Sequence, residues 1–277
     1  MPRMISFLLA CIWIALPVHA QAQQQAQPFS QCMAVAKALP GASYANLTPA
    51  DAAASFTPAA FGDDEVEIQF AGHSTYVITT PSGVTIATDY NGWSGKVAVP
   101  RVVTMNKAHS SHFTLAPDER IEHVLRGWNF DRSPADHDVV VDDVYIRNVT
   151  TDIRNFGAVE QDGNSIFIFE VADLCIGHLG HLHHPLEDSH FAQIGRLDIV
   201  MVPVDGGLTL SHGAMTNIAK RLQSSILLPM HRRGAPLSHF IDMMGDAFVT
   251  NYVGSDSVTV SARTLPRRPT ILVLKGI

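Results

Sequence analysis

The chain has 277 residues, which is enough for one large α/β domain or two small ones, with a sizeable buried core. Hydrophobic residues make up 46% and charged residues 16%, a balance that excludes a chain disordered by its composition. The formal net charge is −7, and the sequence has no basic stripe to neutralise phosphates. We therefore do not expect it to bind nucleic acid.

Residues 1–20 have the features of a secretory signal. A basic "MPRM" precedes the apolar run "ISFLLACIWIALP", which is too short for a comfortable membrane span, and "VHA" ends at Ala20 with small residues. A polar "QAQQQAQ" follows at once, which disfavours the alternative of an uncleaved anchor. We predict cleavage after Ala20 and a periplasmic or secreted protein with no membrane attachment after cleavage.

Residues 21–62 are rich in Ala, Gln, Pro and Ser and are typical of an arm or linker, so we expect the folded domain over 63–277. The mature chain keeps Cys32 in this arm and Cys175 in an apolar strand pattern. An oxidising compartment would allow them to pair. The sequence pattern favours two free thiols, one of them buried.

Short strands joined by turns are predicted from Glu65 onward. Alternating and apolar segments, separated by turns such as "PSG" and "AD", indicate strands or strand pairs at 65–72, 74–80, 84–90, 98–105, 138–149, 164–171 and 174–180. Several of these form predicted hairpins, which favours antiparallel pairing in this part of the chain.

The periodicity changes near residue 197. "LDIVMVPV" (197–204) is a fully apolar strand, and "SSILLPM" (224–230) is another. Between them, residues 211–223 carry apolar side chains at helical spacing, with Ser211 able to cap the start. This βαβ unit predicts parallel strands. Early hairpins and a late crossover together predict a layered α/β protein with mixed sheets.

Histidines follow the ends of three predicted strands. The residues concerned are His109 and His112, then His181, His183 and His184, and then His231, while Asp205 follows a fourth strand. Loops at the carboxyl ends of strands are where open α/β sheets place ligands. Each histidine alone has an ordinary structural explanation, such as a surface loop or a hydrogen-bonded core residue. Their shared placement favours one common site.

Imidazole is a good ligand for zinc and similar ions. A catalytic site needs about three protein ligands and one open position for water, whose pKa the metal lowers to about 7. The histidine placement therefore predicts a metal site that activates water.

The order of motifs resembles the metallo-β-lactamase superfamily, and within it the branch of ascorbate-6-phosphate-lactonase-like hydrolases. The matching segments are "FAGHSTYVITTPSGVTIATDY", "VVTMNKAHSSH", "GNSIFIFEVADLCIGHLGHLHH", "IGRLDIVMVPVDGG" and "SSILLPMHR", in order over most of residues 65–232. The resemblance implies an α/β fold, a four-layer αββα sandwich that binds metal in loops at one edge of its two sheets.

The family's H-x-H-x-D-H motif is degenerate here and reads Lys107, His109, Ser111 and His112. The family's lone histidine before the "GNSIFIFE" strand is missing, and Asp152 is the nearest possible ligand. Its metal-bridging aspartate is replaced by His181, and its last histidine matches His231. The resemblance thus implies one zinc-class ion rather than two, held by His112, His181 and His231. His109 is a fourth ligand or an outer group.

Three further residues are candidates for catalytic roles. Lys107 stabilises an oxyanion in place of the missing metal, or it points to solvent. His73, in "GHS", donates to substrate or orients a ligand, or it is a structural turn residue. Asp89 is an outer partner of a metal ligand, or a turn cap, and Asp205 has the same two interpretations.

The leading hypothesis is an exported hydrolase that uses a metal-activated water on an ester, lactone, amide or phosphoester. The substrate would be a small molecule. The alternative is a metal- or ligand-binding protein of the same fold that has lost hydrolysis, and a third interpretation is a metal-free scaffold with hydrogen-bonded histidines. Neither the particular substrate nor the oligomeric state follows from these residues.

Overall fold

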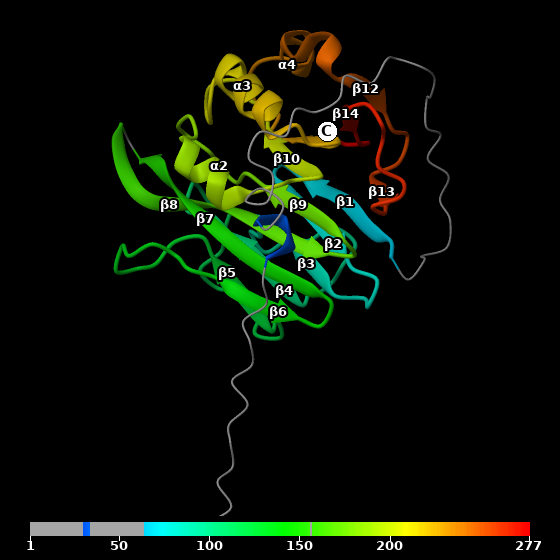
Figure 1. Cartoon of the computed structure of the whole chain (residues 1–277). Coiled ribbons are helices and arrows are strands. Elements are labelled where there is room, and N and C mark those ends of the chain that lie inside the picture. Colours follow the sequence, from blue (N-terminus) through cyan, green and yellow to red (C-terminus); the bar gives the residue numbers. More distant parts are fainter. Residues whose placement is uncertain (1–29, 34–63, 156) are drawn as a thin grey trace, which may run out of the picture.

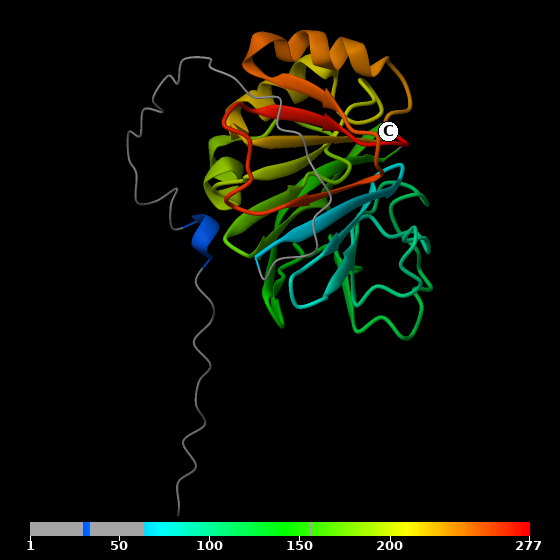
Figure 2. The ribbon, with the colours of Figure 1, turned by 90° about the vertical axis from the view of Figure 1, so that its right-hand side faces the viewer.

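The computed structural model describes residues 30–33, 64–155 and 157–277, and in it two β-sheets pack face to face (Figures 1 and 2). The predicted signal at 1–20 lies outside the described residues, as does most of the predicted arm. Within the described ranges, no helix is both long and apolar enough to cross a bilayer.

The first sheet has six strands in the order β13-β1-β2-β3-β4-β5. The pairs β13–β1, β1–β2 and β2–β3 are antiparallel, whereas β3–β4 and β4–β5 are parallel. The strands are β1 (Val66–Gly72), β2 (Thr75–Thr79), β3 (Thr85–Ala87), β4 (Val102–Met105), β5 (His123–Arg126) and β13 (Ser257–Val260).

The second sheet has eight strands in the order β12-β14-β11-β10-β9-β8-β7-β6. Its β6–β9 part is antiparallel, and its β9–β10–β11 part is parallel, as the crossover predicts. The strands are β6 (Asp138–Val141), β7 (Val144–Asn155), β8 (Ala158–Val171), β9 (Leu174–His178), β10 (Ile199–Pro203), β11 (Ile226–Met230), β12 (Val249–Tyr252) and β14 (Thr270–Val273).

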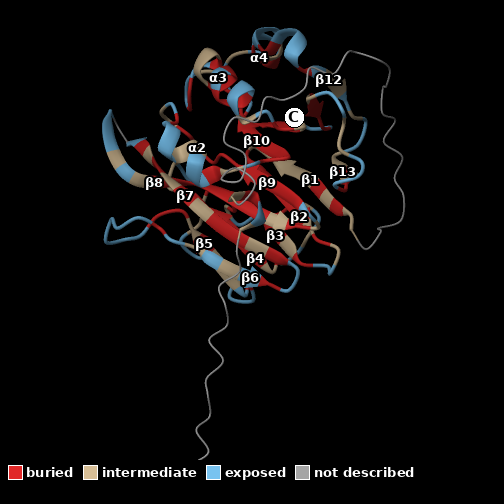
Figure 3. Ribbon diagram, in the orientation of Figure 1, coloured by how far each residue is buried: buried red, intermediate tan, exposed pale blue. Residues whose placement is uncertain are grey.

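Strands β9, β10 and β11 of the second sheet are buried on both faces, which explains their continuous apolar sequences. In β10, Ile199 and Met201 face the first sheet, whereas Val200 and Val202 face the helices. The same alternation holds in β8, where Phe167 packs between the sheets and Ile168 packs on the outer side. Figure 3 shows these strands as the buried centre of the molecule.

Three helices cover the outer face of the second sheet: α2 (Asp188–Ile194), α3 (His212–Leu222) and α4 (Leu237–Met244), with a 3₁₀ turn at Gly245–Ala247. Helix α3 matches the prediction. Its N-cap Ser211 accepts a hydrogen bond from the Ala214 N–H, and Met215, Ile218 and Ala219 enter the core. The outer face of the first sheet is covered in the described structure by loops, whose Ile121 and Trp128 pack on Val103 and Met105.

The expected α/β sandwich with two mixed sheets is thus confirmed, with a loop layer where a fourth, helical layer was expected. The structure adds elements that the sequence did not indicate. These are β5, α2, α4, β12, β13 and β14.

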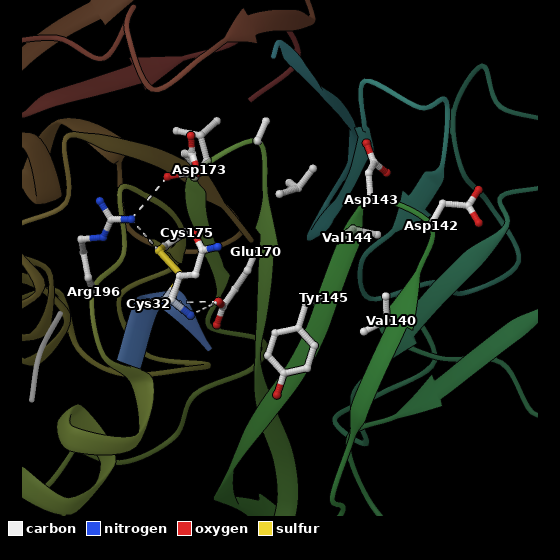
Figure 4. Close-up of a pocket in the computed structure, with 14 residues that line it drawn as sticks. Cys32, Val140, Asp142, Asp143, Val144, Tyr145, Glu170, Asp173, Cys175 and Arg196 are labelled. Carbon is white, nitrogen blue, oxygen red and sulfur yellow. Dashed lines mark hydrogen bonds between the residues drawn. A yellow bond between two sulfur atoms is a disulfide. The ribbon is translucent and has the colours of Figure 1, made fainter. Parts of the chain in front are cut away.

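The expectation of two free thiols is wrong, because Cys32 and Cys175 form a disulfide (Figure 4). Residues 30–33 lie against β8 and β9, where Glu170 accepts hydrogen bonds from the Ser30 hydroxyl and from the Gln31 and Cys32 backbone N–H groups. The Glu170 carboxylate is also paired with Arg147 in a buried contact. These contacts, far apart in the sequence, bring the arm cysteine to Cys175.

Candidate metal centre

Five histidine rings meet at one edge of the two sheets. His73 lies in the turn between β1 and β2, His109 and His112 lie in the loop after β4, His181 follows β9, and His231 follows β11. Each ring has its centroid 4.3–5.7 Å from the centroids of at least three of the others. The carboxyl ends of β4, β9 and β11 therefore deliver their imidazoles to one place.

The four rings of His73, His109, His112 and His231 each offer a nitrogen, and these nitrogens all lie within 4.8 Å of one another. The His181 ring lies beside this group, with its centroid 4.8 Å from that of His112 and 4.7 Å from that of His231. The structure thus brings together all four residues predicted as ligands and adds His73, for which the sequence suggested a catalytic or structural role. We call these five residues the histidine cluster.

Asp89 fixes the orientation of His112. Its Oδ2 atom lies 2.6 Å from His112 Nδ1, and both side chains are completely buried. The Ser74 hydroxyl lies 3.0 Å from the same nitrogen. His112 Nε2 therefore faces the cluster, where it is buried and has no hydrogen-bond partner. Asp89 therefore lies behind His112, in the position expected of an outer partner.

Asp205 fixes the orientation of His231 in the same way. Its Oδ2 atom lies 2.9 Å from His231 Nδ1, and its Oδ1 atom accepts backbone N–H groups of residues 207–209. His231 Nε2 then lies 3.5 Å from His109 Nε2, while His109 Nδ1 is 2.7 Å from the Ser111 hydroxyl. A carboxylate behind a histidine is the usual arrangement behind metal-ligating imidazoles, because it fixes the tautomer and the ring direction.

Two buried asparagines pack beside the loop that carries His181, and one of them, Asn164, bonds to it. The Asn164 Oδ1 atom accepts the His181 backbone N–H at 2.7 Å, and Asn106 donates to Asp89 at 2.9 Å. Gly180 has a φ of +61°, and a Cβ there would lie 2.4 Å from both asparagine side chains, so no larger residue fits. Both ring nitrogens of His181 are buried without a hydrogen-bond partner.

The cluster environment keeps the imidazoles of His73, His109 and His181 neutral. Burial, followed by the charges of neighbouring histidines, lowers the pKa of His181 to about 2 and the pKa values of His73 and His109 to about 4. Neutral rings keep a lone pair for a metal ion. Burial alone would raise the pKa values of Asp89 and Asp205. At Asp89, the charges of His112 and His178 and hydrogen bonds from His112 and Asn106 instead hold the pKa well below its usual range. At Asp205, hydrogen bonds, of which that from His231 has the largest effect, hold the pKa well below its usual range.

Three residues of the site have left-handed backbone conformations, with φ of 54° at His73, 44° at Asp89 and 54° at His231. Such conformations cost roughly 1–3 kcal/mol each and cluster at functional sites. The His231 backbone N–H donates to the His73 carbonyl at 2.8 Å, which joins the two loops directly. The packing around the site therefore maintains strained backbone conformations that direct the rings of His73 and His231 toward the cluster.

His178 and the two asparagines are site residues that the sequence did not single out. His178 is completely buried at the end of β9, where Nε2 donates to the Ser74 carbonyl at 2.9 Å and Nδ1 accepts the Gly180 N–H at 3.1 Å. It therefore connects the second sheet to the β1–β2 turn. A histidine inside an otherwise apolar strand was the available signal.

Several predicted candidates make their hydrogen bonds or ion pairs outside the cluster, although the His183 ring also lies 4.5 Å from the His181 ring between centroids. The Lys107 ammonium forms an ion pair with Glu160 of β8, and the Lys107 backbone N–H donates to the Gly163 carbonyl at 3.3 Å. Asp152 lies in β7, where its Oδ1 accepts the Asp162 N–H at 3.2 Å. The rings of His183 and His184 make hydrogen bonds at both of their nitrogens, as structural residues do.

The cluster fits a bound metal ion. Buried ring nitrogens of His73, His112 and His181 lack hydrogen-bond partners, and leaving such groups unsatisfied is costly unless something binds them. In the described structure the group of close potential ligands contains imidazoles only. A cavity of about 910 Å³ opens beside His73, His109 and His231 and gives a small molecule access to the cluster.

The family model described as "Beta-lactamase superfamily domain" matches residues 67–231, which span nearly all the elements that build this site. The chain belongs to the metallo-β-lactamase superfamily. Among curated proteins, none matches it.

Solved structures of the superfamily have the same fold. A protein from Thermotoga maritima assigned as a Zn-dependent hydrolase is 21% identical, with a TM-score of 0.55, over 76% of this chain and 98% of that one. A protein from Parabacteroides distasonis assigned as a metal-dependent hydrolase is 15% identical, with a TM-score of 0.51, over 65% and 89%. An isothiocyanate hydrolase from Delia radicum gut bacteria is 11% identical, with a TM-score of 0.51, over 70% and 98%. At these identities the similarity shows the fold.

Proposed function

We propose that the protein is an exported hydrolase that binds one zinc-class ion in the histidine cluster. The observation that carries this proposal is the set of buried ring nitrogens of His73, His112 and His181, which lack hydrogen-bond partners within a cluster of five histidine rings. Two carboxylates behind the cluster support it, because they turn the Nε2 atoms of His112 and His231 inward.

His112, His181 and His231 would be the main ligands. They come from both sheets, and two of them are oriented by buried carboxylates. His109 and His73 remain as a fourth ligand or as groups beside the ion. One ion is favoured over two, because the close donors are all imidazoles and no carboxylate lies among them to offset the repulsion between two dications.

A bound zinc-class ion would supply Lewis acidity and lower the pKa of a water to about 7. The protein side chains set the rest of the site. The cavity beside the cluster admits a substrate, and a ring among His73 and His109 that is not a ligand can accept a proton at Nε2. Candidate substrates are small esters, lactones, amides and phosphoesters. Motif similarity to ascorbate-6-phosphate-lactonase-like hydrolases supports the lactone or ester choice.

Export forms a separate part of the proposal. The Cys32–Cys175 disulfide supports it, because such bonds persist in oxidising compartments such as the periplasm. The "VHA" sequence ending at Ala20 supports cleavage of a signal there. Mass spectrometry of protein secreted or exported by an expression host measures the new N-terminus. A mature chain that retains residues 1–20 contradicts this part.

Metal analysis tests the site directly. We expect about one zinc per chain in the purified protein, and a large loss in a His112→Ala, His181→Ala double variant. His239→Ala, which removes an exposed histidine in α4, is the matched control and should keep the metal. Elemental analysis and circular dichroism give metal content and folding for all three proteins.

Turnover is measured with a panel of esters, lactones, amides and phosphodiesters, together with RNA and DNA oligonucleotides. Hydrolysis that follows zinc content supports the proposal. Bound metal without turnover of any substrate favours the alternative, a binding protein with the same fold. A folded wild-type protein that takes up no metal contradicts the metal site and leaves hydrogen-bonded histidines. Cleavage of the oligonucleotides contradicts the expectation that nucleic acid is excluded.

A further inference from the structure

The cavity beside the histidine cluster has an unusual charge composition. Its lining includes Arg232 and Arg233 together with the imidazoles, and it contains no aspartate or glutamate. The whole chain has a formal net charge of −7. A guanidinium on the wall of a cavity without acidic side chains attracts anions into it. The lining therefore favours a ligand that carries a negative group.

The two arginines are in different situations. The Arg232 guanidinium donates to the Ile277 carbonyl at 2.5 Å and so is committed to fixing the wall of the cavity. Arg233 is exposed and makes no hydrogen bond or ion pair with any other described residue. Its charge contributes to lowering the pKa of His109, which places it near the cluster. Arg233 is thus the guanidinium available for a ligand.

The remaining lining residues are largely apolar. Phe70, Met230 and Ile277 form part of the wall, and Leu208 adds an apolar side chain that is 58% exposed. The backbone of Leu208 is held by Asp205, the same carboxylate that orients His231. The loop that positions the ligand histidine therefore also places an apolar surface at the cavity. An apolar group of a few carbon atoms can pack there.

We propose that the substrate of this site is an amphipathic organic acid derivative, whose carboxylate or phosphate is bound by Arg233 while its apolar body packs on Phe70, Leu208 and Ile277. This inference rests on the proposed function for the reaction at the cluster, but the binding of the anion does not require turnover. A guanidinium suits carboxylates and phosphates alike, because its paired N–H groups match two oxygens of either.

Binding is measured by isothermal titration calorimetry with the purified protein and three probes of equal chain length: hexanoate, hexyl phosphate and hexanamide. We expect at least one anionic probe to bind about tenfold or more tightly than hexanamide, because hydrogen bonds to charged groups are the stronger ones. The tighter of the two anions identifies the head group. Equal binding of the neutral and both anionic probes overturns the proposal.

Arg233→Gln tests the residue. We expect it to weaken binding of the preferred anion about tenfold. Arg267→Gln removes the same charge at an exposed position that is not part of the cavity lining, and it should leave the affinity at the wild-type value. Equal affinities in the two variants overturn the proposal. The proposal is also overturned if removing the metal with a chelator abolishes binding of the anion whereas Arg233→Gln does not affect it. The metal ion alone would then bind the anion.

Turnover separates this inference from the proposed function. The mono-p-nitrophenyl ester of adipic acid carries a free carboxylate, and its methyl-capped analogue does not. Arg233→Gln should lower the ratio of kcat/KM for the acid to that for the capped ester about tenfold. If the wild-type protein hydrolyses neither, the ester-hydrolase assignment loses support while the calorimetric result still decides the role of Arg233. An unchanged ratio in active protein overturns the specificity assigned here.

Discussion

The role of Asp89 can be tested by a substitution that replaces one atom of its side chain. In Asp89→Asn an oxygen becomes an NH₂ group, although both carboxylate oxygens now accept hydrogen bonds, from His112 Nδ1 at 2.6 Å and from Asn106 at 2.9 Å. One of these donors would then face another donor. If the amide nitrogen faces His112, the ring must carry its proton on Nε2, the nitrogen that points into the cluster.

The size of the effect follows from that geometry. A wrong tautomer or a lost outer carboxylate lowers metal affinity about 10–100-fold, which corresponds to roughly 1.4–2.7 kcal/mol. The completely buried donor left without an acceptor also costs roughly 1–3 kcal/mol of the free energy of unfolding in the metal-free protein. Both losses arise at one residue that does not itself belong to the group of close potential ligands.

The affinity is measured by competition with a chromophoric chelator, and the stability by urea unfolding in the presence of EDTA. Glu170→Gln is the control, because Glu170 is a buried carboxylate that also accepts several hydrogen bonds but lies beside the disulfide. It should lower stability and leave the metal affinity within about threefold, as expected for distant sites. An Asp89→Asn protein whose metal affinity also stays within about threefold refutes the orienting role of this carboxylate.

Further predictions concern pH, the disulfide and Lys107. In metal-free protein, the unfolded His181 binds a proton as pH falls below about 6.5, but the folded ring, with a pKa of about 2, does not, so stability decreases. His181→Asn should reduce that dependence by about 1.4 kcal/mol per pH unit in urea titrations between about pH 6 and pH 4, and an unchanged slope contradicts the shift. Replacing Cys32 and Cys175 by serine should cost roughly 2–5 kcal/mol in urea unfolding without altering metal affinity, and an unchanged free energy of unfolding would show that the disulfide stabilises nothing. Lys107→Met should change kcat/KM less than about tenfold, because its ammonium pairs with Glu160, whereas a loss of about 10²–10³ would identify an oxyanion-stabilising group.

The elements with strong local signals were predictable. The strand at 197–204, the capped helix at 211–223 and the strand at 224–230 appear as β10, α3 and β11, because their apolar periodicity and Ser211 cap are properties of neighbouring residues. Strand β5 has only one buried side chain among its four, Leu125, so no periodicity reveals it. Strand β14 pairs with β11, some forty residues earlier in the chain, and that pairing depends on the whole sheet.

The candidate site was predictable in part for the same reason. Histidines after strand ends were visible in the sequence, and the strand order brings them together. The outcome for Lys107 depends on Glu160 in a different strand, and no local pattern specifies such a partner. The cysteines were wrongly predicted to be free thiols, because the contact between residues 30–33 and Glu170 that brings Cys32 to Cys175 is formed only in the folded chain. His178 was missed because its apolar neighbours make it look like an ordinary strand residue.

The five rings stand on both halves of the sandwich, three on loops of the first sheet and two on loops of the second. The distances between the rings therefore depend on how the two sheets pack against each other. A cation bound by rings from both sheets would cross-link the two halves of the sandwich. Substitutions in the apolar core between the sheets, far from any imidazole, should then lower the metal affinity. Directed evolution of such a protein could adjust its cofactor loading through core substitutions alone.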